Sequence, residues 1–158
     1  MTIFKVLGAV LLLLVGAGVG WSLVLFERRR YRQLAGFVAL LRLMRMRIDC
    51  FTAPLCDIFA SLDGEVRDAC GVTGAPNDFK ELLRQTRLYV PREARGLFFE
   101  MAALLGGGDK SEQVRCCEYY IGALLPMLDR ARGELPKRER VALLFPLFCA
   151  AVLVLLLL

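Results

Sequence analysis

The sequence predicts an all-α protein in which two terminal transmembrane helices flank a small, cytoplasmic, antiparallel helical bundle. Residues 6–26 carry no charged side chain, and residues 141–158 are likewise uncharged and rich in Leu and Val. Each stretch is about as long as the roughly 17–25 apolar residues that a helix needs to cross a bilayer. The region between them holds nearly all the charges and lacks the alternating pattern of strands. We therefore divide the chain into residues 3–26, 27–140 and 141–158.

The first apolar stretch is expected to remain in the protein as a membrane anchor. A cleaved signal peptide would have a shorter apolar region, of about 7–15 residues, followed by a small-residue cleavage site. Here the stretch is longer, and residues 21–26 lead directly into an arginine cluster. The second stretch is shorter and contains Pro146, so both a full span and a tilted or marginal span are compatible with it.

Basic residues flank both predicted spans on the side of the central region. They are Arg28, Arg29, Arg30 and Arg32 after the first span, and Lys137, Arg138 and Arg140 before the second. At the opposite ends of the two spans, Lys5 is the only charged residue. Because Lys and Arg concentrate in cytoplasmic loops, we expect a cytoplasmic central region and two short termini outside. The same cations can contact anionic headgroups of the lipid bilayer. A nucleic-acid partner is not expected, because the basic residues do not form a stripe with interleaved aromatic residues.

The central region is expected to begin with a helix that continues directly out of the first span, because no breaker occurs before Pro54. Its apolar stripe, at three- and four-residue spacing, consists of Leu34, Phe37, Val38, Leu41, Met44 and Ile48. A second helix is expected to start at Pro54, with Thr52 or Ala53 near its cap, and to end at Gly71. Its stripe consists of Leu55, Ile58, Phe59, Leu62 and Val66.

Capping residues predict the next two helices. Asp78 and Glu81 have the spacing of a capping box, so a third helix is expected to start there. Pro91 is suited to the first turn of a fourth helix, and the three glycines at 106–108 are expected to end it.

A last long helix is expected after the glycines. Asp109 followed by Glu112 again has the spacing of a helix cap. We expect a kink at Pro126 and a break at Gly133 and Pro136, before the second span. With the preceding segments, this gives four or five antiparallel helices packed as a small bundle.

The residue types present argue against an enzyme. The chain contains no histidine, which excludes His-based acid–base catalysis, His-activated nucleophiles and His metal ligands. Its six cysteines form no C-x-x-C pair and no usual zinc spacing, so we interpret them as small apolar residues. The triple glycine is not part of a GxxxxGK[ST] phosphate-binding loop. We therefore expect no catalytic residue, no metal and no cofactor.

Two sets of residues are candidates for contacts with other helices or proteins. A partner-binding surface is predicted from residues expected to face outward: Asp57, Phe99, Asp109, Glu112, Gln113 and Tyr119. Gln113 has the alternative of reaching back to the loop backbone. In the first span, Gly8, Gly16, Gly18 and Gly20 allow close helix packing. They can pack on the second span or on another copy of the chain, which would form a homo-oligomer.

The order and spacing of several segments resemble the stage III sporulation protein AB family of endospore-forming bacteria. The resemblance extends over essentially the whole chain, and no single segment is specific by itself. The segments are a Gly-containing first span, Arg32-Gln33-Leu34 followed by Leu40, Leu43 and Ile48, Pro54-Leu55, Leu105-Gly106 with Asp109 and Gln113, residues 131–134, and the Leu/Val-rich C-terminal span. The chain departs from the family in its many Arg and Cys residues and in an extra residue within 52–55. No individual contact residues are transferred.

This resemblance implies a helical cytoplasmic domain similar to those of type II secretion inner-membrane platform proteins. It implies a non-catalytic platform subunit of the sporulation channel between mother cell and forespore, in the mother-cell membrane around the forespore. The implied partners are a cytosolic secretion-type ATPase of the sporulation system and other membrane subunits of the channel. A hairpin adaptor or regulator in another secretion or pilus-like assembly is the alternative, and only partner identity separates the two. A membrane enzyme is disfavoured, because the spans contain no ionisable residue other than Lys5 and Cys149.

Overall fold

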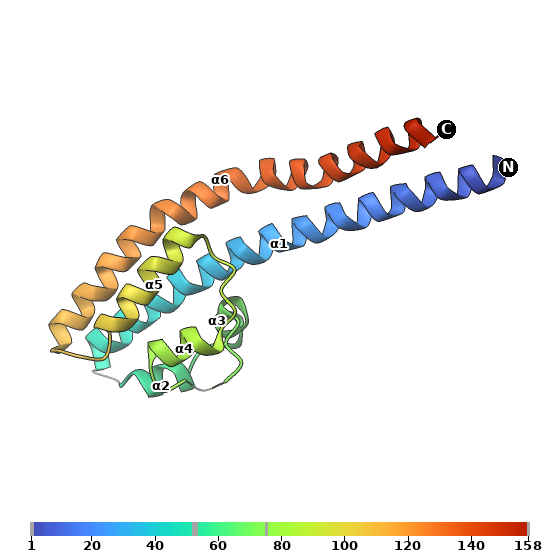
Figure 1. The fold of residues 1–158 in the computed structure, drawn as a ribbon. Coiled ribbons are helices and arrows are strands. Elements are labelled where there is room, and N and C mark those ends of the chain that lie inside the picture. Colours follow the sequence, from blue (N-terminus) through green and yellow to red (C-terminus); the bar gives the residue numbers. More distant parts are fainter. Residues whose placement is uncertain (1, 52–53, 75, 158) are drawn as a thin grey trace. The chain divides into compact units, whose positions relative to one another are not determined.

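The computed structural model describes residues 2–51, 54–74 and 76–157, with the backbone alone for residues 2–6 and 157. Within these ranges the chain is all-helical and contains no strand (Figure 1). The helices are α1 (Thr2–Phe51), α2 (Leu55–Ala60), α3 (Gly64–Cys70), α4 (Phe79–Gln85), α5 (Arg92–Leu104) and α6 (Lys110–Leu157).

The chain forms two compact units, which we describe separately. The paired-helix unit consists of Met1–Arg29 and Arg132–Leu158, and the central unit consists of Arg30–Ala131. Helices α1 and α6 each contribute residues to both units.

Of the two long helices, α6 is more continuous than the sequence predicts, whereas α1 agrees with the prediction. The expectation that α1 runs on past the first apolar stretch is confirmed, because it extends over 50 residues. The predicted break at Gly133 and Pro136 is wrong, since α6 is helical throughout its 48 residues. Pro126, where the sequence predicts a kink, also lies within the continuous helix. Each proline removes only its own backbone donor, and the hydrogen bonds on both sides of it preserve the helix.

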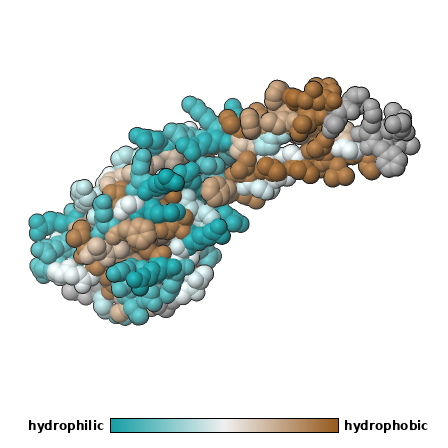
Figure 2. All heavy atoms as spheres, viewed as in Figure 1, coloured by the Kyte–Doolittle hydropathy of each residue, from teal (hydrophilic) through white to brown (hydrophobic). Residues whose placement is uncertain are grey.

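Helices α1 and α6 are both long and apolar enough to cross a membrane. Their most apolar windows have mean hydropathies of 2.4 and 2.2. Hydrophobic residues cover most of the face of these apolar segments that is visible in Figure 2. Large apolar side chains therefore remain exposed on the paired-helix unit, as expected where lipid rather than protein surrounds a helix.

Two of the four span glycines pack against the second helix of the paired-helix unit. A Cβ atom added at Gly16 would lie 2.8 Å from the Cβ of Ala150, and one at Gly20 would lie 3.2 Å from the carbonyl oxygen of Ala142. At these two positions the intramolecular alternative is confirmed, because only glycine allows the backbones to approach this closely. Gly8 and Gly18 have no atom within 4 Å of an added Cβ.

A single hydrophobic core holds the central unit together. The predicted stripe of α1 is buried in this core. The Phe37 ring is fully buried there. The ring centroid of Phe37 is 4.5 Å from that of Phe98 on α5 and 6.4 Å from that of Phe79 on α4. Helix α6 contributes Cys117, Tyr120 and Leu124 to the same core. Aromatic residues from separate helices thus join α1 to α4 and α5.

Most of the predicted helix boundaries within the central unit are confirmed. Asp78 caps α4 by accepting a hydrogen bond of 2.6 Å from the backbone N–H of Glu81, whose carboxylate accepts one of 2.8 Å from the backbone N–H of Asn77. Pro91 directly precedes α5. Gly71 ends α3 in the left-handed conformation, with φ of 79°.

The segment from Pro54 to Gly71 differs from the prediction, because it forms two short helices instead of one. Helix α2 ends at Ser61, whose hydroxyl donates to the carbonyl of Ile58, and α3 starts after Asp63. Gly64, at the first position of α3, has a poor helix propensity. Leu62 is nevertheless buried, so the turn between the helices keeps the predicted stripe facing the core. The cap predicted at Thr52 or Ala53 lies outside the described residues.

Candidate functional site

A groove formed largely by loops is the best candidate site in the central unit, and we call it the loop groove. Its volume is about 560 Å³. It is lined by Ile48, Pro54, Leu55, Cys56, Asn77, Asp78, Gly106, Gly108, Asp109, Lys110 and Gln113. These residues come from the end of α1, the start of α2, the segment before α4, the α5–α6 loop and the first turn of α6. Three parts of the chain that are distant in sequence, around Pro54, Asp78 and Asp109, therefore form one surface.

Glycines and side-chain hydrogen bonds shape the α5–α6 side of the loop groove. Gly106 and Gly108 have φ values of 97° and 92°, which side chains other than glycine rarely adopt. Gln113 donates a hydrogen bond of 3.4 Å from its side-chain amide to the carbonyl of Gly108, so the predicted contact with the loop backbone is present. The Ser111 hydroxyl donates to the Asp109 carboxylate over 3.1 Å. The turn thus holds Asp109 at the start of α6.

Carboxylates predominate among the charged groups of the loop groove. Asp78 and Asp109 line it together with one cation, Lys110. The Lys110 ammonium lies 4.0 Å from the carboxylate of Asp49, which offsets part of its charge. A groove with this balance is suited to a basic segment of a partner protein. Among the described residues, no group of three or more His, Cys, Asp or Glu side chains is placed to hold a metal ion.

The structure brings together part of the predicted partner-binding surface. Asp109 and Gln113 line the loop groove, whereas Asp57 and Glu112 are exposed next to lining residues in the sequence. Phe99 and Tyr119 do not line it.

The predicted outward orientation of Phe99 and Tyr119 is confirmed. Phe99 is 54% exposed and Tyr119 is 68% exposed. Their neighbours Phe98 and Tyr120 are buried in the core. Phe99 and Tyr119 are therefore outward-facing apolar surface of the central unit, separate from the loop groove.

Two of the predicted basic residues, Arg28 and Arg138, form ion pairs in the paired-helix unit. Arg28 of α1 donates two hydrogen bonds, of 2.6 and 3.2 Å, to the carboxylate of Glu139 on α6. These hydrogen bonds hold the pKa of Glu139 below its usual value. A second pair has its cation on α6: Arg138 lies 3.7 Å from Glu27 of α1. Arg138 also pairs with Glu134 over 2.7 Å. Two reciprocal pairs therefore join the helices where their apolar segments end.

The other predicted cations are distributed over both units. Arg29, Lys137 and Arg140 belong to the paired-helix unit and are exposed. Arg30 and Arg32 belong to the central unit.

Gln33, whose role the sequence does not predict, is buried between α1 and two loops of the central unit. Its side chain is only 3% exposed. Its amide nitrogen donates to the carbonyls of Cys70 and Arg87 over 3.0 and 2.9 Å, and its oxygen accepts a hydrogen bond of 2.7 Å from the backbone N–H of Tyr89. Gln33 thereby fixes the ends of two loops to α1. The available signal was its spacing, because it lies four residues before Phe37 on the apolar stripe.

Two of the six thiols belong to the core, as expected for cysteines that serve as small apolar residues. Cys70 and Cys117 are fully buried. Burial raises the pKa of the Cys70 thiol to about 12. The pKa of the Cys117 thiol is raised to about 11, and burial is the main cause. Both are therefore neutral at physiological pH and poor nucleophiles. Cys50, Cys56 and Cys149 are exposed.

Comparison with known proteins identifies the family. We found no similar chain among curated proteins or among solved structures. The model of the stage III sporulation protein AB family matches residues 5–158. Because this match extends over nearly the whole chain, including both apolar segments and the loop groove, the protein belongs to the stage III sporulation protein AB family.

Proposed function

We propose that this sporulation protein is a non-catalytic platform subunit of the channel between mother cell and forespore. In this proposal, α1 and α6 cross the mother-cell membrane around the forespore through their apolar segments. The central unit lies in the cytoplasm as an antiparallel helical bundle and docks a cytosolic secretion-type ATPase. Other membrane subunits of the channel contact the membrane-spanning segments.

The loop groove is the observation that carries the docking part of the proposal. It combines a volume of about 560 Å³ with the carboxylates of Asp78 and Asp109. Loops held by the helical core contribute Pro54, Asn77, Asp78, Gly106, Gly108 and Asp109 to its lining, an arrangement often found at binding sites. We therefore assign the groove to a Lys- or Arg-bearing segment of the ATPase, with Asp109 as a charged contact.

Charge reversal at Asp109 tests this assignment. The full-length chain in lipid nanodiscs is titrated with the ATPase encoded in the same genome, and affinity is measured by biolayer interferometry. Asp109→Arg is expected to weaken binding at least ten-fold, because a like-charge contact replaces an attraction and costs on the order of 1–2 kcal/mol or more. Glu93→Arg is the matched control, since Glu93 is also exposed near a helix N-terminus but does not line the groove.

Two other outcomes would contradict the proposal, one for the groove and one for the partner. Equal losses for Asp109→Arg and Glu93→Arg would assign the effect to net charge and contradict the groove as docking site. Absence of binding by the folded wild-type chain would contradict this ATPase as the partner. It would favour the hairpin adaptor of another membrane assembly.

Cysteine labelling tests the proposed orientation. Membranes containing the full chain are treated with a membrane-impermeant maleimide, and labelled cysteines are mapped by mass spectrometry. Cys50 and Cys56 are exposed in the central unit, so we expect labelling in inverted vesicles and none in spheroplasts. Cys70 and Cys117 serve as internal controls, because their buried, neutral thiols should react only after denaturation. Labelling of Cys50 and Cys56 in spheroplasts would place the central unit on the opposite side of the membrane.

A further inference from the structure

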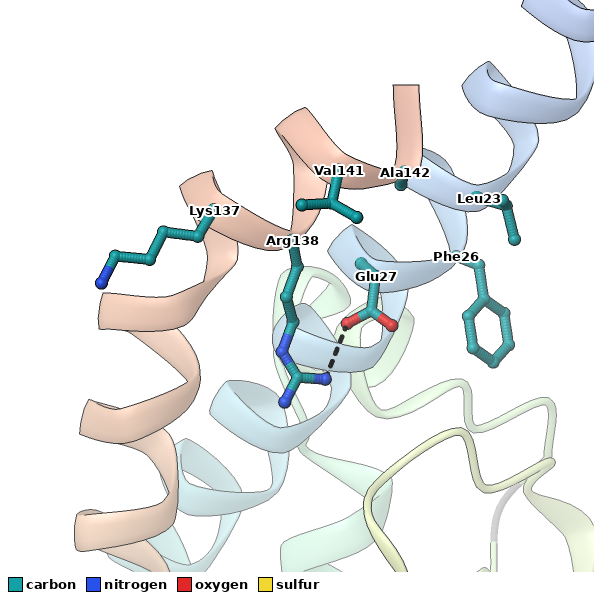
Figure 3. A pocket seen from close by; sticks show the side chains of 7 residues that line it. All are labelled: Leu23, Phe26, Glu27, Lys137, Arg138, Val141 and Ala142. Carbon is teal, nitrogen blue, oxygen red and sulfur yellow. Dashed lines mark ion pairs between the residues drawn. The ribbon is translucent and has the colours of Figure 1, made fainter. Parts of the chain in front are cut away.

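A second groove lies between α1 and α6 in the paired-helix unit, and we call it the interhelix groove. Its volume is about 340 Å³. It is lined by Leu23, Phe26, Glu27, Lys137, Arg138, Val141 and Ala142 (Figure 3). This volume is near the lower limit of small-molecule sites, which span roughly 300–1,000 Å³.

The lining of the interhelix groove changes from apolar to charged along the helices. Leu23 and Phe26 on α1 and Val141 and Ala142 on α6 form the apolar part. The charged part lies next to it along each helix, at Glu27 directly after Phe26 on α1 and at Lys137 and Arg138 one turn before Val141 on α6. A phospholipid has the same order of groups, an acyl chain and then a charged headgroup.

The charged part of the interhelix groove contains one cation that no carboxylate neutralises. The Glu27 carboxylate is paired with Arg138 over 3.7 Å, as the dashed line in Figure 3 marks, and Arg138 is further paired with Glu134. Among the described residues, the side chain of Lys137 makes no ion pair and no hydrogen bond. Figure 3 shows the exposed Lys137 side chain extending away from Glu27 and Arg138, so its stem borders the groove, and rotation about that flexible stem brings the ammonium to a ligand at the groove mouth.

We propose that the interhelix groove binds one anionic phospholipid. Its phosphate pairs with the ammonium of Lys137, and part of an acyl chain lies against Leu23, Phe26 and Val141. The ion pair between Glu27 and Arg138 removes the repulsion that a free carboxylate would exert on the phosphate. Anionic headgroups at a membrane surface attract basic side chains at this level of the bilayer. The proposal rests on the membrane placement given under the proposed function.

The test measures lipid retained by the full-length chain after reconstitution in phosphatidylglycerol–phosphatidylcholine nanodiscs and release for native mass spectrometry. The wild type is expected to retain one phosphatidylglycerol in preference to phosphatidylcholine. Lys137→Gln should weaken this binding about five-fold, which corresponds to the roughly 1 kcal/mol of one basic residue at an anionic surface. Val141→Trp should also displace the lipid, because Val141 is 65% exposed and a larger ring would fill the groove without disturbing the core.

Arg140→Gln is the matched control, because it removes the same charge from an exposed position on the same helix that does not line the groove. It should retain the lipid. Equal losses for Lys137→Gln and Arg140→Gln would overturn the proposal in favour of general surface attraction. Equal retention of both lipids, or displacement by inorganic phosphate alone, would also overturn it. Failure of the chain to insert into nanodiscs would instead contradict the membrane placement itself.

Discussion

Gln33→Leu is expected to lower the free energy of unfolding of the central unit by about 3 kcal/mol. The substitution removes three hydrogen bonds from the side chain, to Cys70, Arg87 and Tyr89. Each backbone group that loses its partner inside the protein costs roughly 1–3 kcal/mol, and the partly exposed ones recover some of this from water. Thermal and urea denaturation of the full chain in mild detergent, followed by circular dichroism, measures the total change.

Hydrogen exchange should localise the effect of Gln33→Leu. Protection is expected to fall around residues 70–72 and 87–89, where the lost hydrogen bonds held the loops to α1. Gln85→Leu is the matched control, because Gln85 is exposed and, among the described residues, its amide bonds only to Glu81. This substitution should cost less than about 0.5 kcal/mol. Similar losses for the two variants would show that Gln33 does not anchor the loops.

Gln33→Glu distinguishes the contribution of side-chain shape from that of hydrogen bonding, because it keeps the size of the side chain and changes its donors. An ionised carboxylate fits the same space and accepts from the Tyr89 N–H, but it cannot donate to the carbonyls of Cys70 and Arg87. This variant should therefore be destabilised at pH 7. Because burial among carbonyls raises the pKa of that carboxyl in the folded state, stability should partly return as the pH falls and the protonated form donates one hydrogen bond.

Gly36→Val is expected to destabilise the central unit by about 2–3 kcal/mol, and Gly36→Ala by about 1 kcal/mol or more. A Cβ atom at Gly36 would lie 2.8 Å from the Cβ of Ala69 and 3.1 Å from both the carbonyl carbon of Ala69 and the backbone nitrogen of Cys70. Backbone atoms of α3 cannot rotate away as a flexible side chain can, so α1 and α3 must separate. Denaturation of the full chain measures the change.

The control for Gly36→Ala uses a helical glycine in open space. A Cβ atom at Gly96 on α5 would meet no atom within 4 Å, so Gly96→Ala should stabilise the protein by up to about 1 kcal/mol through helix propensity. The two identical substitutions are thus expected to have opposite signs. Stabilisation by Gly36→Ala would contradict the close approach of α1 and α3.

Features that depend on a few neighbouring residues were predictable. The two apolar segments, the Asp78–Glu81 cap, the start of α5 after Pro91 and the end of α3 at Gly71 all follow from local rules, and the structure contains them. The outward orientation of Phe99 and Tyr119 was also predictable, because adjacent residues of a helix point in different directions.

Local rules failed where packing outweighs a residue's own preference. Gly133 and Pro136 disfavour a helix, yet α6 continues through them because the neighbouring hydrogen bonds remain. From Pro54 to Gly71, the apolar spacing predicts one helix, whereas two short helices with a turn bury the same residues. Periodicity shows which side chains face a core, and it does not show whether the backbone stays straight between them.

The sequence by itself determined that this is an all-helical protein of the stage III sporulation protein AB family with two segments apolar enough to cross a membrane. Only the tertiary structure decided which residues form its surfaces and contacts. The loop groove joins Pro54, Asp78 and Asp109, and the side chain of Gln33 bonds to residues 37 to 56 positions away. Such contacts depend on how the whole core packs, and their geometry therefore cannot be read from the spacing of residues along one helix.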